Sequence, residues 1–218
     1  MKTFFVILVL ILISFFIFQA YVARSTARTE EQKYKVLEKE GDFEIRYYPK
    51  AVMASVSMVS SSYRKMSSTG FRRLAGYIFG GNEKQESIAM TAPVHMEVKE
   101  DTATMSFVMP TGYSMNTLPA PKDSGVKIHM SEEEYVASVT YSGFSSDEDI
   151  KVQSARLKDY LDKKGIAYSG DFQYLGYNPP YQLKGRRNEV IVRIQYKEKS
   201  KRSEEHTSEL QSQFRISY

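Results

Sequence analysis

The chain of 218 residues contains no cysteine, and this absence excludes several kinds of site. Disulfides, thiolate metal sites and cysteine nucleophiles all require a thiol. Tryptophan is also absent, and the only three histidines lie far apart in the sequence. No two of them have the spacing that is typical of a zinc site.

The sequence also lacks the short motifs that mark common enzyme classes. It contains no GxSxG elbow, no phosphate-binding glycine loop and no HExxH motif. The 30 Lys and Arg residues are interspersed with 26 Asp and Glu residues, so no long basic run favours nucleic-acid binding. We therefore expect neither an enzyme nor a partner of DNA or RNA.

One long hydrophobic run stands near the N-terminus. Residues Phe4 to Phe18 are apolar except for Ser14, and the run continues weakly to Val22. At 1.5 Å per helical residue, these 19 residues cross most of a hydrocarbon layer of about 30 Å. Residues 1–29 are therefore predicted to form a single-pass membrane anchor with a short linker. A cleaved secretory signal, followed by export, is the alternative, although the best cleavage site, Ser25-Thr26-Ala27, lies far beyond the apolar run.

The C-terminal segment has a different origin in our interpretation. "RSEEHTSELQS", Arg202 to Ser212, reads as the translation of a common sequencing adapter. Residues 201–218 are therefore predicted to be read-through that is disordered, and His206 is predicted to carry no chemistry. A natural polar tail would lack regular structure as well.

The remaining segment, residues 30–200, contains an internal repeat. When the chain is shifted by 83 residues against itself, identical residues align without a gap. This alignment divides the domain into pseudo-repeats of about 34–109 and 126–196. The matched positions are Ala54–Val56 with Ala137–Val139, Ser62 with Ser145, Arg73-Leu74 with Arg156-Leu157, and Tyr77 with Tyr160.

Each repeat is predicted to form two strands, a helix and two further strands. The first helix begins near Ser68 and ends at Gly80-Gly81, and the second extends from a capping box at Ser146 to Gly165. The fold class is therefore α+β, a distorted antiparallel β-barrel of about eight strands with two helices, formed by a β-β-α-β-β duplication. The predicted strands are Tyr34–Tyr47, Val52–Met58, Ile88–Val98, Thr104–Met109, Val126–Met130, Tyr135–Tyr141, Phe172–Tyr177 and Glu189–Gln195.

Three phrases of this domain resemble the SOUL haem-binding protein family. They are "DFEIRYYP" from Asp42, "TGFRRLAGYIFGGNEKQESIAMTAPV" from Thr69 and "GYNPPYQLKGRRNEVIVRI" from Gly176. They occur in the family's order and at its spacing, over about residues 34–194. The resemblance implies a distorted barrel of two repeats that binds haem or another porphyrin reversibly and non-covalently, in a shallow apolar pocket, without enzymatic turnover.

The resemblance also implies where an axial ligand would lie. Histidine-bearing members have that residue between the Arg and the Tyr of an "EIR-His-Tyr" strand, and Tyr47 occupies the position here. Tyr47 is thus either a tyrosinate ligand of ferric iron or an aromatic wall of the pocket. His95 is a less favoured axial ligand, because single histidines in strands are usually structural.

The first helix and its lead-in supply the other predicted haem contacts. Large flexible side chains suit a flat apolar macrocycle, and basic side chains suit its propionates. The same apolar face is equally typical of a core, and the same basic residues of a solvated surface. The pocket candidates are Tyr47, Met58, Met66, Phe71, Leu74 and Ile78, and the propionate candidates are Arg64, Lys65, Arg72 and Arg73.

Two other functions fit the same fold. One is a module that binds lipophilic small molecules in general, and the other is an interaction protein with a groove for a partner helix. The sequence gives no indication of the oligomeric state.

Overall fold

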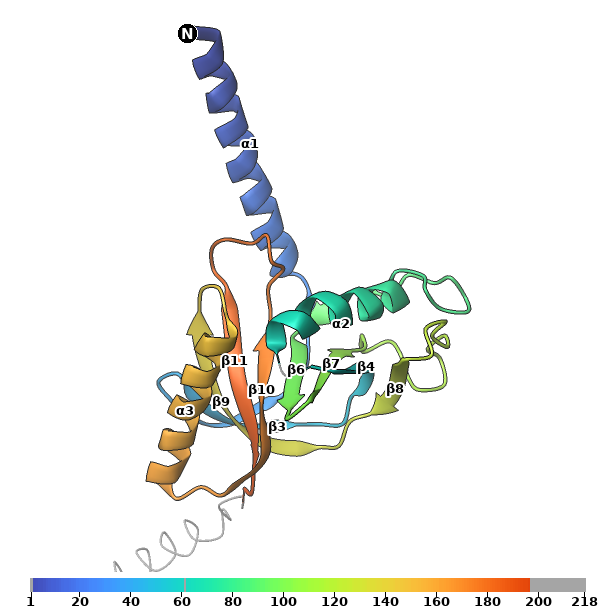
Figure 1. Ribbon diagram of the computed structural model, residues 1–218, viewed down its shortest axis with the longest axis vertical. Helices are drawn as coiled ribbons and strands as arrows, with labels where there is room; N and C mark the ends of the chain where they lie inside the picture. The colour runs from blue at the N-terminus through green and yellow to red at the C-terminus, as the bar shows by residue number, and fades with distance from the viewer. Residues whose placement is uncertain (1, 61, 197–218) are drawn as a thin grey trace, which may run out of the picture.

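A computed structural model describes residues 2–60 and 62–196. A long helix, α1 (Lys2–Thr26), extends from a domain that consists of a large antiparallel sheet and two helices (Figure 1). By length and composition alone, α1 is able to cross a membrane. The C-terminal segment that we interpret as adapter read-through, with His206, lies outside the described residues.

The domain contains most of the elements that the sequence predicts, in the predicted order. In chain order they are β1 (Glu30–Glu31), β2 (Lys35–Glu40), β3 (Phe43–Tyr48), β4 (Val52–Val59), α2 (Tyr63–Ile78), β5 (Thr91–Ala92), β6 (Val94–Lys99), β7 (Thr102–Val108), β8 (Val126–Met130), β9 (Glu134–Ser142), α3 (Asp147–Lys164), β10 (Tyr168–Gly176) and β11 (Arg187–Ile194).

Nine of these strands form one sheet in the order β2-β3-β9-β11-β10-β6-β7-β4-β8, and β1 pairs with β5 separately. The sheet has a symmetric connectivity about the β10–β6 pair. On one side the order outward is β10, β11, β9, β3, and on the other it is β6, β7, β4, β8. The first strand of each repeat therefore lies beside the second strand of the other repeat: β3 pairs with β9, and β8 pairs with β4. This order accommodates two β-β-α-β-β units, while their origin by duplication stays a prediction.

The predicted distorted β-barrel is not confirmed, because the described strands form an open sheet with β2 and β8 at its edges. The sheet is nevertheless curled. Connections of three residues, 49–51 and 131–133, join β3 to β4 and β8 to β9, although these strands are far apart in the sheet. Such short links bring the two edges of the sheet close together. We call the line between these edges the seam, and the described edge strands, β2 and β8, do not pair with each other across it.

The strand count also differs from the prediction. The predicted single strand Tyr34–Tyr47 is a hairpin of β2 and β3, because Gly41 has a φ of 59° and turns the chain there. The left-handed Gly41 and the pairing of Glu40 with Phe43 therefore divide the predicted strand in two, which gives the sheet nine strands.

Helix α3 begins and ends where the sequence predicts, whereas α2 begins earlier than predicted. Ser146 and Asp149 form the expected capping box, and Gly165 ends α3 with a φ of 66°. Helix α2 begins at Tyr63 instead of near Ser68. Its first turn is capped from outside, because Asp147 Oδ1 accepts a hydrogen bond from the Arg64 amide at 3.2 Å.

Both domain helices cover the same face of the sheet and share one core. Helix α2 packs on β4, β6, β7 and β8, and α3 packs on β9, β10 and β11. Met66 and Leu74 of α2 meet the buried side chains of these strands, as Leu157 of α3 does. A smaller cluster on the opposite face contains Tyr48, Ala92, Val136, Leu175, Tyr177 and Ile191.

Candidate functional site

The apolar residues predicted on α2 fall into two groups. Met66, Leu74 and Ile78 are fully buried in the main core, with exposed fractions of 0%, 0% and 1%. In this arrangement they support the helix from beneath and offer no surface to a ligand. Phe71 lies at the rim instead, 39% exposed, with its ring 5.4 Å from that of Phe107.

Met58 lies on β4 and is not brought next to Phe71. It stands opposite Ala103 of β7, whereas Phe71 contacts Phe107. These two positions on β7 are four residues apart, about 13 Å at the rise of a strand. The structure therefore spreads the predicted pocket residues along the core instead of grouping them around one concavity.

The basic residues of α2 also differ from one another. Arg64, Lys65 and Arg72 are exposed, and within the described residues they form no ion pair. Arg73 binds Asp123 with two hydrogen bonds, Nε to Oδ2 at 2.7 Å and Nη2 to Oδ1 at 2.5 Å. Those contacts lower the pKa of Asp123 to about 2. Three of the four basic residues are therefore available to an anion, and Arg73 is engaged.

Tyr47 lies on β3, a strand that is not among those beneath α2. Its hydroxyl donates to Glu133 Oε2 at 2.8 Å, and its ring lies 5.2 Å from that of Tyr135. The hydrogen bond to Glu133 raises the pKa of Tyr47. The phenol therefore stays protonated, and coordination of iron would require Tyr47 to leave Glu133.

His95 is nearly buried on the face opposite the helices. Its Nε2 lies 2.7 Å from Gln32 Oε1, and burial lowers the pKa of the imidazole to about 4. The ring is therefore neutral at physiological pH, which suits a metal ligand, but one nitrogen is already engaged. Among the described residues, no group of three His, Asp or Glu side chains has the arrangement of a metal site.

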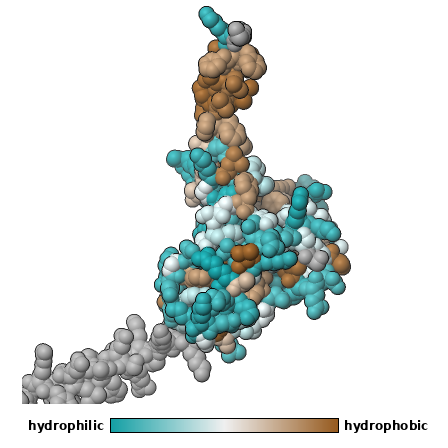
Figure 2. Space-filling view, turned by 60° about the vertical axis from the view of Figure 1, so that its left-hand side comes forward, coloured by the Kyte–Doolittle hydropathy of each residue, from teal (hydrophilic) through white to brown (hydrophobic). Residues whose placement is uncertain are grey.

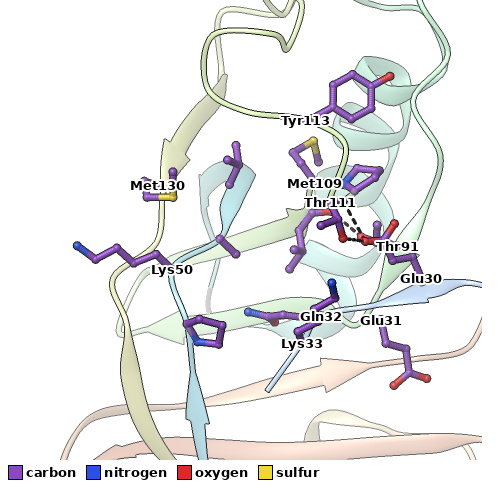
Figure 3. Close-up of a pocket in the computed structure, with 15 residues that line it drawn as sticks. Glu30, Glu31, Gln32, Lys33, Lys50, Thr91, Met109, Thr111, Tyr113 and Met130 are labelled. Atoms are coloured by element: carbon purple, nitrogen blue, oxygen red, sulfur yellow. Dashed lines mark hydrogen bonds between the residues drawn. The ribbon is translucent and has the colours of Figure 1, made fainter. Parts of the chain in front are cut away.

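A cavity of about 230 Å³ opens at the seam between the two ends of the sheet (Figure 3). We call it the seam cavity. Five chain segments build it: residues 30–33, the β3–β4 turn with the start of β4, Thr91 of β5, the end of β7 with the residues that follow it, and Met130 of β8. Its lining residues are Glu30, Glu31, Gln32, Lys33, Pro49, Lys50, Ala51, Val52, Thr91, Val108, Met109, Pro110, Thr111, Tyr113 and Met130.

The seam cavity combines apolar side chains with charges of both signs, since Glu30 and Glu31 line it together with Lys33 and Lys50. Met109 and Met130 lie on different sides of the opening, and Lys33 and Lys50 project from its margin (Figure 3). Glu30 is held by Thr111, whose hydroxyl and backbone amide both donate to its carboxylate and lower its pKa. The volume is below the 300–1,000 Å³ of most small-molecule pockets, so the cavity is too small to enclose a large planar ligand.

A buried charge cluster lies near the seam, on the helix-free face. Glu189 is fully buried, and it accepts hydrogen bonds from Arg46 Nη1 at 2.6 Å and from Arg187 Nη2 at 2.7 Å. Tyr177 and Thr140 also donate to its carboxylate, at 3.0 and 3.2 Å. Burial would raise the pKa of Glu189, but the two arginines lower it. These contacts join β3, β9 and β11, which indicates a structural role for Arg187 and Glu189.

The fold and the seam cavity thus define an α+β domain whose curled sheet has a concave apolar opening. A family model described as SOUL heme-binding protein matches residues 29–193. Heme-binding protein 2 of Homo sapiens is 36% identical over 172 residues, 75% of this chain and 83% of that protein. Heme-binding protein 1 of Mus musculus is 28% identical, with 74% and 90% covered. The chain belongs to the SOUL heme-binding protein family.

Solved structures show that the fold extends to distant proteins. The C-terminal domain of EcmrR has a TM-score of 0.50 and 9% identity, covering 75% of this chain and 99% of that one. A hydrolase from Listeria innocua has a TM-score of 0.51 and 9% identity, covering 79% and 97%. At this identity, the likeness concerns the fold alone.

Proposed function

We propose that the domain binds haem or another porphyrin non-covalently and reversibly, and holds it without catalytic turnover. The observation that carries this proposal is the match of residues 29–193 to the SOUL heme-binding family. The names of the relatives describe binding instead of a reaction. The sequence also lacks the common catalytic motifs, which is consistent with binding alone.

The seam cavity is the place that the geometry favours for one edge of the macrocycle. Its methionines adapt to a flat apolar surface, and Lys33 and Lys50 are the lining residues that could pair with propionates, with the Glu30 carboxylate already bound by Thr111. Because the cavity is open and small, most of the porphyrin would stay outside it. Such a shallow site would hold the porphyrin loosely and release it readily.

The exposed side of α2 is the competing location. Phe71 offers part of an aromatic face there, and Arg64, Lys65 and Arg72 offer charge. This surface is convex in helical geometry, so it would cover only one face of a porphyrin. We propose it as the second site to test, with Tyr47 and His95 as the residues whose ligation the iron spectra would reveal.

The location is tested by titrating residues 30–200 with hemin and recording the Soret band. This segment keeps both hydrophobic clusters, which lie within residues 34–196, so it retains its core without α1. We expect Lys50→Glu with Met130→Glu to weaken binding by about tenfold or more, since a charge-assisted contact contributes about 1.5–3 kcal/mol. The matched control is Lys151→Glu on α3 with Val152→Glu, two exposed residues away from the seam.

Two outcomes would redirect the proposal. If Phe71→Glu with Arg72→Glu weakens binding and the seam variant does not, haem binds at α2. If the wild-type domain gives no saturable Soret shift, the general lipophilic module or the partner-binding groove becomes the better function.

We also propose that α1 anchors the domain in a membrane as a single span. Its apolar side chains project from a mainly hydrophilic domain (Figure 2). Alkaline carbonate releases peripheral proteins from membranes, so the chain should remain in the pellet after this treatment. Release of a shortened chain into the medium would favour the cleaved secretory signal.

A further inference from the structure

The loop between β10 and β11, residues 177–186, contacts the C-terminal part of α1. Gln19 binds this loop twice, since its Nε2 donates to Tyr181 O at 3.1 Å and its Oε1 accepts from the Leu183 amide at 3.2 Å. The Thr26 hydroxyl donates to Gln182 Oε1 at 2.8 Å. These contacts join the helix and the loop although about 160 residues separate them in the chain.

The contacts lie at the level where the apolar run of α1 ends. Phe18 is the last residue of that run, and its ring lies 6.2 Å from that of Tyr181. The run from Phe4 to Phe18 is about 22 Å long at 1.5 Å per residue, about 8 Å less than the hydrocarbon thickness of about 30 Å, and its weakly apolar extension to Val22 makes up most of that difference. If this run occupies the hydrocarbon layer, the loop lies at the boundary with the lipid headgroups.

The exposed side chains of the loop suit that boundary. Tyr181 is 56% exposed and Leu183 is 48% exposed, and Phe144 beside the loop is 59% exposed. Arg186 stacks on Phe144, 4.5 Å from the ring centre, and Lys184 is exposed as well. Aromatic, aliphatic and basic side chains together are typical of protein surfaces at the membrane interface.

Several polar groups of the loop form hydrogen bonds within the loop, although the buried Arg186 Nε has no hydrogen-bond partner there. Arg186 Nη1 donates to Pro179 O at 2.7 Å and to Gln182 O at 2.8 Å. Gln182 Nε2 donates to Lys184 O at 2.9 Å. Backbone carbonyls that already have partners lose little when water is replaced by lipid, so this loop can enter the interface at low cost.

We infer that the β10–β11 loop is a second membrane contact, in which Tyr181 and Leu183 enter the headgroup region of the bilayer beside α1. The inference rests on the proposed membrane span. The loop would hold the domain at the lipid surface in one orientation, where α1 alone would leave it free to pivot.

Because the chain has no tryptophan, single-tryptophan variants of the full chain report depth directly. Tyr181→Trp reports the loop, and Phe16→Trp reports α1. Tyr168→Trp is the matched control, because Tyr168 is at the other end of β10, about 26 Å from the start of the loop. The variants are reconstituted in phosphatidylcholine vesicles whose acyl chains are brominated near the headgroup, and bromine quenches any indole in contact with them.

We expect the emission of Tyr181→Trp to fall and shift to the blue in brominated vesicles, while Tyr168→Trp stays unquenched. Adding Leu183→Asp to Tyr181→Trp should restore part of the lost emission. If Phe16→Trp is quenched and Tyr181→Trp is no more quenched than Tyr168→Trp, the span is correct and the loop contact is wrong. If Phe16→Trp is unquenched, α1 does not insert and both proposals fail.

Discussion

Replacing Glu189 by glutamine tests how the buried charge cluster holds the sheet together. Glutamine keeps the size of the side chain but removes its charge, which leaves Arg46 buried at 1% exposure with Glu44 as its remaining acidic partner. Breaking a buried pair from one side costs about 3–5 kcal/mol. Because Glu44 stays in place at 2.8 Å, we expect the lower end of this range, about 3 kcal/mol.

This loss is large enough to measure by urea or thermal unfolding of residues 30–200. For a domain of this size, each kcal/mol lowers Tm by about 2–4 °C, so we expect Tm to fall by roughly 6–12 °C. Asp162→Asn is the control, since its pair with Lys158 is about half exposed and contributes under about 1 kcal/mol.

The pH dependence gives a second readout of the same cluster. The lowered pKa of Glu189 means that its contribution is present above the ordinary carboxyl pKa and is lost as the pH falls through the lower, folded value. The deficit of the glutamine variant should therefore be constant near neutrality and shrink only in acid. A loss of free energy of unfolding no greater than that of Asp162→Asn would refute the role assigned to Glu189.

Three further predictions concern other groups. The pKa of His95 is about 4 in the folded state against an ordinary value of 6.5. The free energy of unfolding should therefore fall by up to about 3 kcal/mol as the pH falls from 6.5 to 4. Urea titrations at several pH values should show that His95→Gln flattens this dependence. Tyr47→Phe should leave the ferric haem spectrum unchanged, because the phenol stays protonated, and a lost charge-transfer band would instead identify a ligand. Asp147→Ala should cost about 1 kcal/mol in urea unfolding, because it removes the cap of α2, and an unchanged midpoint would contradict that role.

Local signals in the sequence predicted some elements well. The ends of α3 depend on Ser146, Asp149 and Gly165, all within or next to the helix, and the structure confirms them. The start of α2 was missed because its cap comes from Asp147, about 85 residues further along the chain. The distorted barrel is not confirmed, because closure of the sheet depends on how closely β2 and β8 approach each other in space, and the hydrophobic periodicity of the strands gives no information on that distance.

The site was harder to predict than the fold. The spacing of Met66, Leu74 and Ile78 on one helical face is the same for a core and for a pocket, and in the structure these residues are in the core. The seam cavity could not be read from any single motif. Its lining comes from five separated segments, including Lys50 and Met130, whose proximity follows only from the curl of the sheet.

The central claim is that this domain holds a tetrapyrrole at a defined place, and a hemin titration of residues 30–200 tests it most directly. We expect a saturable Soret shift with one porphyrin per chain, which the paired Lys50 and Met130 substitutions weaken about tenfold and the α3 control does not. A linear, unsaturable response equal to that of an unrelated protein would contradict the claim.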